Sequence, residues 1–331
     1  RDPEDEIFTT KEHYNVLQLE RAGNDFIMRA AHHGEPLQLV GSHEMDHMPA
    51  EVLAGLFICS HDPDVVEKAR IYNVRITRPV PEDYNAYSSG LLAGRMEIMD
   101  VFSGERKIIY ENSPGFEAPN FMPGGEELLF NMGGSLYTIP TTGGDIAKLN
   151  TGFADRNNND HGISWDGKQI AISHFREAQE GGGSTIYVLP IEGGEPRRIS
   201  KSSPSYWHGW SPDDRDVVFT GRRGEDPRYN IYKASVTDGS ETRLTDVREG
   251  ERADGPEYSP DGEYIYYNST ESGTMQIWRM KPDGTMHEQI TFDEYNDWFP
   301  HISPDGQWMV FLSYPSDINW NGHPFYKRVM L

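Results

Sequence analysis

Histidine and glutamate side chains recur at similar intervals in the second half of the sequence, and these residue types bind divalent metal ions. His161 and His208 each lie four residues ahead of the second position of a repeated turn, while Glu257 and His301 lie three residues ahead of it. Three imidazoles and one carboxylate can hold a divalent metal (Mn, Ca or Zn), with preferences that differ between the ions. The spacing therefore predicts a site for a metal or an anionic ligand, if the fold brings these side chains together. The alternative is that each histidine only forms hydrogen bonds inside the protein.

Aromatic and acidic side chains lie close to these four positions. Rings beside carboxylates and amides are typical of sugar-binding surfaces, because the rings stack on sugars while the polar groups bind the hydroxyls. The alternative is that the rings pack between elements of the fold. The predicted ligand-binding residues are Asp160, Tyr206, Trp207, Asp254, Asp297, Trp298, Phe299 and His323.

No residue pattern identifies a catalytic group. The sequence holds no Gly-x-Ser-x-Gly motif, no P-loop and no dinucleotide-binding fingerprint. Arg156 and Arg252 lie near the histidines in the sequence, but neither is an obvious base for β-elimination. We therefore assign no catalytic residue.

A repeated tetrapeptide shows how the fold positions these residues. Ser-Pro-Asp-Gly occurs at residues 259–262 and 303–306, with related copies at 122–125, 164–167 and 211–214, and the spacings are 42, 47, 48 and 44 residues. Each copy leads into an alternating apolar run, and a second such run ends in a glycine-containing turn, which predicts hairpins. Four short antiparallel strands in about 45 residues are typical of a β-propeller blade. Because innermost strands line the channel of a propeller, we expect the candidate side chains to converge at one channel mouth.

The repeats resemble those of the TolB-like family. The resemblance rests on the Ser-Pro-Asp-Gly turn, the strand after it, and the Ile-Tyr, Gly-Gly and Leu-Thr elements of the second half, and it covers roughly residues 85–331. It implies a six-bladed propeller. Such propellers serve as partner-binding modules, peptidase gates and sugar lyases. In the similar oligogalacturonate lyases an axial metal is held by several His and a Gln, but this sequence has no Gln at an equivalent position.

The blade count is incomplete in the sequence. Five tetrapeptide units are present, and Met96–Tyr110 supplies two strands ahead of the first. Val329–Leu331 is predicted to begin a third strand in the blade of Ser303. We expect about five blades plus part of the sixth, and a truncated C-terminus.

The first eighty residues do not carry the repeat. Alternating runs predict five strands, at Val16–Glu20, Asp25–Ala30, Leu37–Val40, Val52–Cys59 and Ala69–Ile76. Five strands in eighty residues are typical of an antiparallel sandwich. The segment resembles the C-terminal half of a concanavalin-like jelly roll of the laminin-G or glucanase type, which implies a truncated N-terminus as well. Thr77–Asn85 is the predicted linker, so we expect a β-sandwich fragment in residues 1–80 and a propeller in residues 81–331.

Charge and composition limit the function classes. The sequence has 30 Lys and Arg against 53 Asp and Glu, a net charge of −23, which argues against a nucleic-acid partner. No apolar run is long enough for a transmembrane segment, and a single cysteine excludes an internal disulfide framework. Part of the negative charge comes from the repeated Asp of the turns. The family resemblance implies a periplasmic, secreted or cell-surface location.

Together these observations predict an all-β protein with two alternative functions. The first is an extracytoplasmic propeller that binds a glycan (a polysaccharide or oligosaccharide) or an extracytoplasmic protein at its channel mouth. The second is a metal-dependent polysaccharide lyase or hydrolase resembling oligogalacturonate lyase, in which His161, His208, His301 and Glu257 hold the metal.

Overall fold

The computed structural model describes residues 14–32, 35, 37–58, 60, 62–71, 74–78, 80–81, 83–175, 183–319, 325–327 and 329–331. The chain divides into two compact units. One consists of Arg1–Thr77 with Met99–Arg106, and the other consists of Arg78–Ile98 with Lys107–Leu331.

The first unit contains one three-stranded antiparallel sheet. Its strands are β1 (Val16–Ala22), β2 (Asp25–Ala31) and β3 (Gln38–Glu44), in the order β1-β2-β3. These strands confirm the first three that the sequence predicts. A sandwich needs a second packed sheet, so the concanavalin-like jelly roll stays a prediction.

The last two predicted strands of this unit are wrong. No strand is assigned to the described residues of 52–58 and 69–76, and Cys59 lies outside the described residues. The side chains of Leu53, Phe57 and Ile76 are exposed. An alternating run becomes a strand only where a neighbour accepts its backbone hydrogen bonds, and the described part of the chain offers these runs none.

The second unit is built from four-stranded antiparallel sheets, as expected for TolB-like propeller blades. Its elements are α1 (Ala86–Ser89), the paired β4 (Gly94–Met99) and β5 (Arg106–Asn112), then β6 (Glu117–Phe121), β7 (Glu127–Met132), β8 (Ser135–Pro140), β9 (Ala147–Lys148), β10 (Asn157–Ile163), β11 (Gln169–Phe175), β12 (Ser184–Pro190), β13 (Arg197–Arg198), β14 (Ser205–Trp210), β15 (Asp216–Gly221), β16 (Asn230–Ser235), β17 (Glu241–Arg243), β18 (Ala253–Tyr258), β19 (Ile265–Ser269), β20 (Gln276–Met280), β21 (Glu288–Gln289), β22 (Asn296–Ile302) and β23 (Met309–Tyr314). Four sheets are complete, namely β6–β9, β10–β13, β14–β17 and β18–β21, and β22 pairs with β23.

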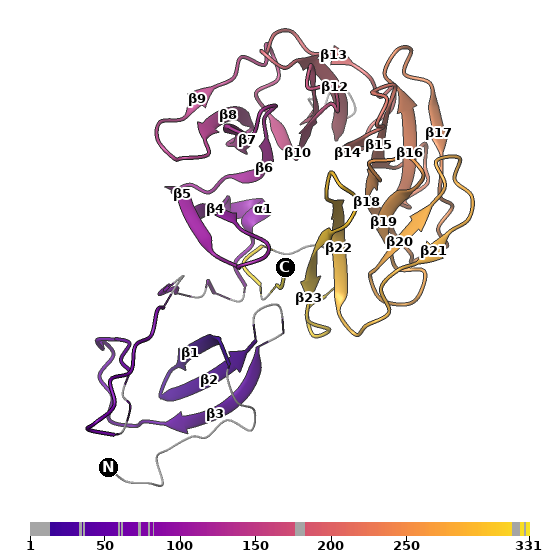
Figure 1. The fold of residues 1–331 in the computed structure, drawn as a ribbon. Helices are drawn as coiled ribbons and strands as arrows, with labels where there is room; N and C mark the ends of the chain where they lie inside the picture. The colour runs from indigo at the N-terminus through magenta and orange to yellow at the C-terminus, as the bar shows by residue number, and fades with distance from the viewer. Residues whose placement is uncertain are drawn as a thin grey trace. The chain divides into compact units, whose positions relative to one another are not determined.

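These sheets are arranged side by side around a common centre. The first strands, β6, β10, β14, β18 and β22, face the centre, and the fourth strands lie at the periphery (Figure 1). Except for α1, all regular elements in the described residues are strands, which confirms the all-β prediction. Met330 exchanges two backbone hydrogen bonds with Ser313 in β23, each 2.9 Å long. Met330 thus pairs with β23 through an isolated bridge, at the place where the sequence predicts a third strand to begin.

The repeated tetrapeptide forms a hydrogen-bonded turn between the first and second strand of each sheet. In the turn of Ser259, the hydroxyl donates to Asp261 Oδ1 at 2.6 Å and accepts from the Tyr264 amide at 3.0 Å. The corresponding bonds recur at Ser164, Ser211 and Ser303. The bond from Ser259 is the main reason why the pKa of Asp261 lies below its ordinary value. The turn carboxylates are therefore charged at neutral pH.

One turn departs from the repeat and gains a contact. The fourth position has a positive φ, which glycine adopts without strain, and it is Gly in the turns at 164–167, 259–262 and 303–306. Asp214 occupies it with a φ of 58°. Its carboxylate accepts hydrogen bonds from the amides of Trp165 and Asp166, at 2.7 and 2.9 Å, in the turn of the preceding sheet. Asp214 thus links the sheets β10–β13 and β14–β17.

The hydrophobic core lies between neighbouring sheets. One cluster joins Trp207, Trp210 and Phe219 of the β14–β17 sheet to Ile186 and Val188 of the sheet before it. Side chains from both faces are thereby removed from water, which supplies the main driving force for stacking the sheets. None of the helices in the described residues is long and apolar enough to span a membrane.

Candidate functional site

The five central strands share an irregularity of the backbone pairing at equivalent positions. Each of them, β6, β10, β14, β18 and β22, has a register shift against its neighbour, typical of a β-bulge. In three of them the bulge contains a residue with positive φ directly ahead of a proline, namely Ala118, Gly255 and Phe299. Bulges change the direction in which side chains point, and they are enriched at functional sites. The polar residues near these bulges form the candidate site.

His161 and His208 occupy the same position in the sequence repeat but different positions in the sheets. His161 pairs with Ile172 in the ladder, whereas the equivalent place in the next sheet is taken by Trp207, which pairs with Phe219. His208 lies in the bulge that follows. Matching the histidines by spacing alone is therefore incorrect, because the bulge of β10 adds two residues relative to its neighbouring strand and that of β14 adds one.

His161 is a buried, neutral side chain. It is 3% exposed, and its Nδ1 lies 2.9 Å from the carbonyl oxygen of Asn159. Burial lowers the pKa of His161 to about 4, so the imidazole is uncharged at neutral pH. Its environment matches the alternative that the sequence left open, a histidine that forms hydrogen bonds inside the protein.

His208 lies among acidic side chains. Its Nε2 is 3.4 Å from Oδ1 of Asp254, and Phe299 stacks on its ring with 5.8 Å between centroids. Burial opposes the charged imidazolium, but the hydrogen bond that His208 donates to Asp254 and the charge of Asp160 outweigh burial and raise the pKa of His208. Asp254 Oδ2 also accepts from Arg252 Nη2 at 2.7 Å. His208 therefore lies between carboxylates that favour its protonated form.

Two further carboxylates, Asp160 and Glu117, have fewer partners that favour their charged form than Asp254 has. Burial raises the pKa of Asp160 to about 6, although the charge of His208 and a hydrogen bond from Asn158 act against the rise. Burial also raises the pKa of Glu117 to about 7, and the nearby charge of Asp160 adds to the effect. Glu117, Asp160, His208, Arg252 and Asp254 are called the inner-strand cluster from here on.

Sequence reasoning missed Glu117, although the sequence contained a usable signal. Glu117 stands two residues ahead of Pro119, as Asp254 stands two residues ahead of Pro256. Both also take the same place in the ladder, because Glu117 pairs with Asn131 and Asp254 with Asn268. Alignment on these prolines, rather than on the histidines, identifies it.

Glu257 and His301 are brought together, as the sequence predicts. Oε2 of Glu257 lies 2.5 Å from Nδ1 of His301, and Oε1 accepts from the Ile302 amide at 3.1 Å. The side chain of His301 is 67% exposed. The surrounding protein disfavours its charge, but Glu257 outweighs this effect and raises the pKa of His301.

Arg222, Tyr206 and Tyr229 lie beside the cluster and contact it through Arg252 and Asp160. The Cζ atoms of Arg222 and Arg252 lie 5.1 and 5.0 Å from the ring centroid of Tyr229. Burial and the neighbouring Tyr229 raise the pKa of Tyr206, to which the charge of Asp160 also contributes. Tyr206 therefore keeps its proton at physiological pH and can donate a hydrogen bond.

The remaining predicted ligand-binding residues are placed differently. Trp207 is 7% exposed and Trp298 is 0% exposed, so both rings pack within the protein. Asp297 is also fully buried, and its Oδ1 accepts from Ser313 Oγ at 2.6 Å. His323 lies outside the described residues.

The four residues predicted to bind a metal do not fit a single centre in this arrangement. His161 is buried, His208 pairs with Asp254, and His301 pairs with Glu257. Within the described residues, no group of three or more His, Cys, Asp or Glu side chains is arranged to hold a metal ion. A metal role for these residues stays a prediction.

Comparison with known proteins gives a consistent family match. Residues 207–320 match the model of the TolB beta propeller domain. An uncharacterized protein of Agrobacterium fabrum, Atu1656, is 46% identical over 231 residues, which are 69% of this chain and 76% of the relative. The structure of a putative TolB from Agrobacterium tumefaciens aligns with a TM-score of 0.63 and 46% identity, covering 69% of this chain and 80% of that one. An oligogalacturonate lyase in complex with manganese aligns with a TM-score of 0.50 at 13% identity, covering 67% and 64%, so this likeness concerns the fold alone.

Proposed function

This chain belongs to the TolB-like β-propeller family, and on that premise we propose that it is a binding module whose partner docks on the inner strands of the propeller. The complete ring of this proposal has six blades. The four complete sheets and the two-stranded sheets β4–β5 and β22–β23 support that number. Each blade then contributes its central strand to one shared binding surface.

The observation that carries the proposal is that two carboxylates of the inner-strand cluster, Glu117 and Asp160, are buried with only partial compensation of their charge. Glu117 and Asp160 are partly buried, and neither forms an ion pair within the described residues. Burial of a carboxylate is costly unless a cation or hydrogen-bond donors compensate it. An ammonium or guanidinium group of a ligand would supply that compensation. The proposed ligand therefore carries a cationic group.

This charge distribution favours a protein partner over a glycan. Lysine and arginine side chains and the N-terminal amine of a polypeptide are cationic, whereas common neutral or uronic-acid glycans are not. The buried rings of Trp207 and Trp298 are also not accessible for stacking on a sugar. The periplasmic, secreted or cell-surface location implied by the family resemblance is part of the proposal, with an extracytoplasmic protein as the partner. No observation in the described residues favours the metal-dependent lyase or hydrolase.

Isothermal titration calorimetry with an acetylated, amidated tetralysine peptide tests this function. We expect binding at pH 8 and weaker binding at pH 5, because Glu117 and Asp160 become protonated below their raised pKa values of about 7 and 6. The Glu117→Gln/Asp160→Asn variant is expected to bind at least about tenfold more weakly, since two charge-assisted interactions are lost.

The matched control is Asp261→Asn/Asp305→Asn, which removes the same charge from turns outside the inner-strand cluster. The control variant is expected to bind the peptide as the unaltered protein does. If both double variants lost the same affinity for the peptide, the loss would come from the net charge of the protein and not from the inner-strand cluster. Binding of cellohexaose or oligogalacturonate in place of the peptide would overturn the preference for a cationic ligand.

A further inference from the structure

One arginine beside the inner-strand cluster has no hydrogen-bond acceptor among the described residues. Arg222 directly follows β15 and is half-buried, and its Cζ lies 5.1 Å from the ring centroid of Tyr229. Its Nε is buried without a hydrogen-bond partner. In the part of the chain that the structure describes, no ion pair includes this side chain. Because a buried N–H group without an acceptor is costly, the guanidinium of Arg222 is suited to an acceptor on a ligand.

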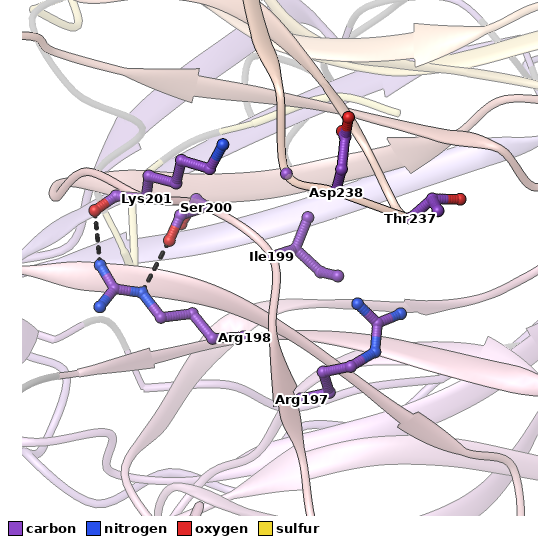
Figure 2. Close-up of a pocket in the computed structure, with 8 residues that line it drawn as sticks. Arg197, Arg198, Ile199, Ser200, Lys201, Thr237 and Asp238 are labelled. Atoms are coloured by element: carbon purple, nitrogen blue, oxygen red, sulfur yellow. Dashed lines mark hydrogen bonds between the residues drawn. The ribbon is translucent and has the colours of Figure 1, made fainter.

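Other arginines of the same unit donate to acceptors inside the protein. Arg223, the next residue in the chain, donates through Nε to Glu241 Oε2 at 2.7 Å. Arg198, which borders a cavity between two sheets, donates through Nε and Nη2 to two backbone carbonyl oxygens, at 2.8 and 2.6 Å (Figure 2). The missing acceptor is therefore particular to Arg222 and does not follow from the fold.

The fold accommodates a different residue at the equivalent position of the next sheet. The amide of Arg222 donates to the carbonyl oxygen of Pro204 at 3.4 Å, and the amide of Thr270 donates to that of Arg252 at 3.0 Å. Arg222 and Thr270 thus take the same place after β15 and β19. Thr270 is buried, and its hydroxyl accepts from the Arg252 amide at 2.9 Å. A small side chain bonded to the backbone therefore suffices at this position.

Two tyrosines connect Arg222 to the inner-strand cluster. The Cζ of Arg252, a member of the cluster, lies 5.0 Å from the same Tyr229 ring centroid that Arg222 contacts. The rings of Tyr206 and Tyr229 are 6.3 Å apart between centroids. Burial is the main cause of the raised pKa of Tyr206; the charge of Asp160 adds to it and the charge of Arg222 opposes it, so both charges lie near this side chain.

The two opposite charges are close to one tyrosine and yet do not neutralise each other. Within the described residues, no ion pair joins Arg222 to Asp160. Asp254 compensates Arg252 through two hydrogen bonds, to Nε at 3.1 Å and Nη2 at 2.7 Å, so the charge of that arginine is already paired. An unpaired cation therefore lies beside carboxylates whose own charge is only partly compensated.

We propose that Arg222 binds a carboxylate of the same ligand whose cationic group binds Glu117 and Asp160. This inference rests on the proposed function and narrows its ligand to a polypeptide that carries a carboxylate beside its lysine or arginine. A guanidinium donates two parallel hydrogen bonds to a carboxylate. The cation–π contact with Tyr229 orients the guanidinium before the ligand arrives. A C-terminal lysine is the simplest such ligand, because one residue supplies both charges.

Calorimetric titration of the full chain at pH 8 with two acetylated tetralysine peptides tests the inference. One peptide is amidated, and the other ends in a free carboxylate. The free acid has one positive charge fewer, so general attraction to a chain of net charge −23 favours the amide. We expect the reverse, with the free acid bound at least about fivefold more tightly, because its carboxylate accepts charge-assisted hydrogen bonds from Arg222.

The Arg222→Thr variant carries the residue that the next sheet has at this position. It is expected to lose the preference for the free acid while it still binds the amide. The matched control is Arg215→Thr, because Arg215 is exposed beside an outer turn and pairs with Asp213 there. This control is expected to keep the preference. Thermal unfolding checks that both variants are folded.

The outcomes distinguish this inference from the function on which it rests. If the unaltered protein binds both peptides without preferring the free acid, or if the preference persists in Arg222→Thr, the carboxylate site is overturned and the cationic ligand stands. A preference that is lost in both variants would also overturn it, because net charge would then explain the effect. If neither peptide binds, the proposed function fails and this inference fails with it.

Discussion

The strands β10 and β14 occupy the same place in neighbouring sheets, yet they give their histidines opposite environments. In β10 three residues, 158–160, stand opposite one on the neighbouring strand, and His161 returns to the ladder and is buried. In β14 only His208 is inserted, and it lies beside Asp254. The length of the bulge, rather than the spacing in the sequence, thus decides whether a histidine is buried in the ladder or lies beside a carboxylate.

The largest expected effect is a difference in stability between alanine variants of Gly162 and Gly209, the two glycines that follow these bulges. A Cβ atom at Gly162 would overlap the indole ring of Trp207, whereas one at Gly209 would meet Val218 Cγ2 at 3.1 Å. We expect Gly162→Ala to lower the free energy of unfolding by about 3 kcal/mol, because overpacking displaces a buried ring. Gly209→Ala is expected to cost about 1 kcal/mol or less. Urea denaturation measures both, and equal costs would contradict this contrast.

The next effect is a difference in pH dependence. His161 has a pKa of about 4 in the folded protein, below its ordinary value of 6.5, so protonation favours unfolding. Its uncharged state is required for stability, which is lost as the pH falls below 6.5, up to about 3 kcal/mol in total. His161→Gln is therefore expected to be less sensitive to acid between pH 6.5 and 4.

The stability contributed by His208 depends on pH in the opposite direction. Its pKa is raised in the folded protein, so the stability it contributes is present below pH 6.5 and lost as the pH rises through the folded value. His208→Gln is expected to remove this decline. Denaturant unfolding between pH 4 and pH 9 measures both variants, and profiles of the same sign would mean that the two sites are alike.

A smaller effect is expected on the pKa of His208 when Asp254, the carboxylate that pairs with it, is replaced. Asp254→Asn removes its charged partner, while burial of the imidazole remains. The pKa of His208 is therefore expected to fall, as followed by NMR titration of the imidazole. Asp166→Asn serves as the control, because that carboxylate lies in an outer turn. An unchanged pKa in Asp254→Asn would assign the shift to other charges.

The smallest effect tests the link between the two sheets. Asp214→Gly restores the residue found in the other Ser-x-Asp turns and keeps the positive φ, but it removes the acceptor for two amides. We expect a loss of about 1 kcal/mol in the free energy of unfolding. A stabilised variant would show that relief of backbone strain at Asp214 outweighs the two hydrogen bonds.

Local patterns were sufficient to predict the propeller sheets. The Ser-x-Asp turn closes through bonds among its own residues, so its sequence determines its structure. The alternation of apolar and polar residues wrongly predicts strands at Val52–Cys59 and Ala69–Ile76, because a strand also needs a partner strand that the sequence pattern does not specify. In the candidate site, the pair Glu257–His301 could be predicted from spacing.

The rest of the site depends on information that spacing does not contain. The bulge of β10 separates His161 from His208, and the packing between sheets buries Trp207. Glu117 was missed because it stands six residues ahead of the second position of its turn, outside the positions that were aligned on the histidines. Residues that stand two positions ahead of a proline in a central strand give a better alignment than the histidines.

The contact made by Asp214 also supplies a probe for separation of the two sheets. The amides of Trp165 and Asp166 belong to a surface turn, where backbone protons ordinarily exchange rapidly with solvent. Because both donate to a carboxylate of the next sheet, their protons are protected only while the two sheets are in contact. Hydrogen–deuterium exchange at these two amides therefore reports transient opening of one blade junction, separately from the unfolding of either blade.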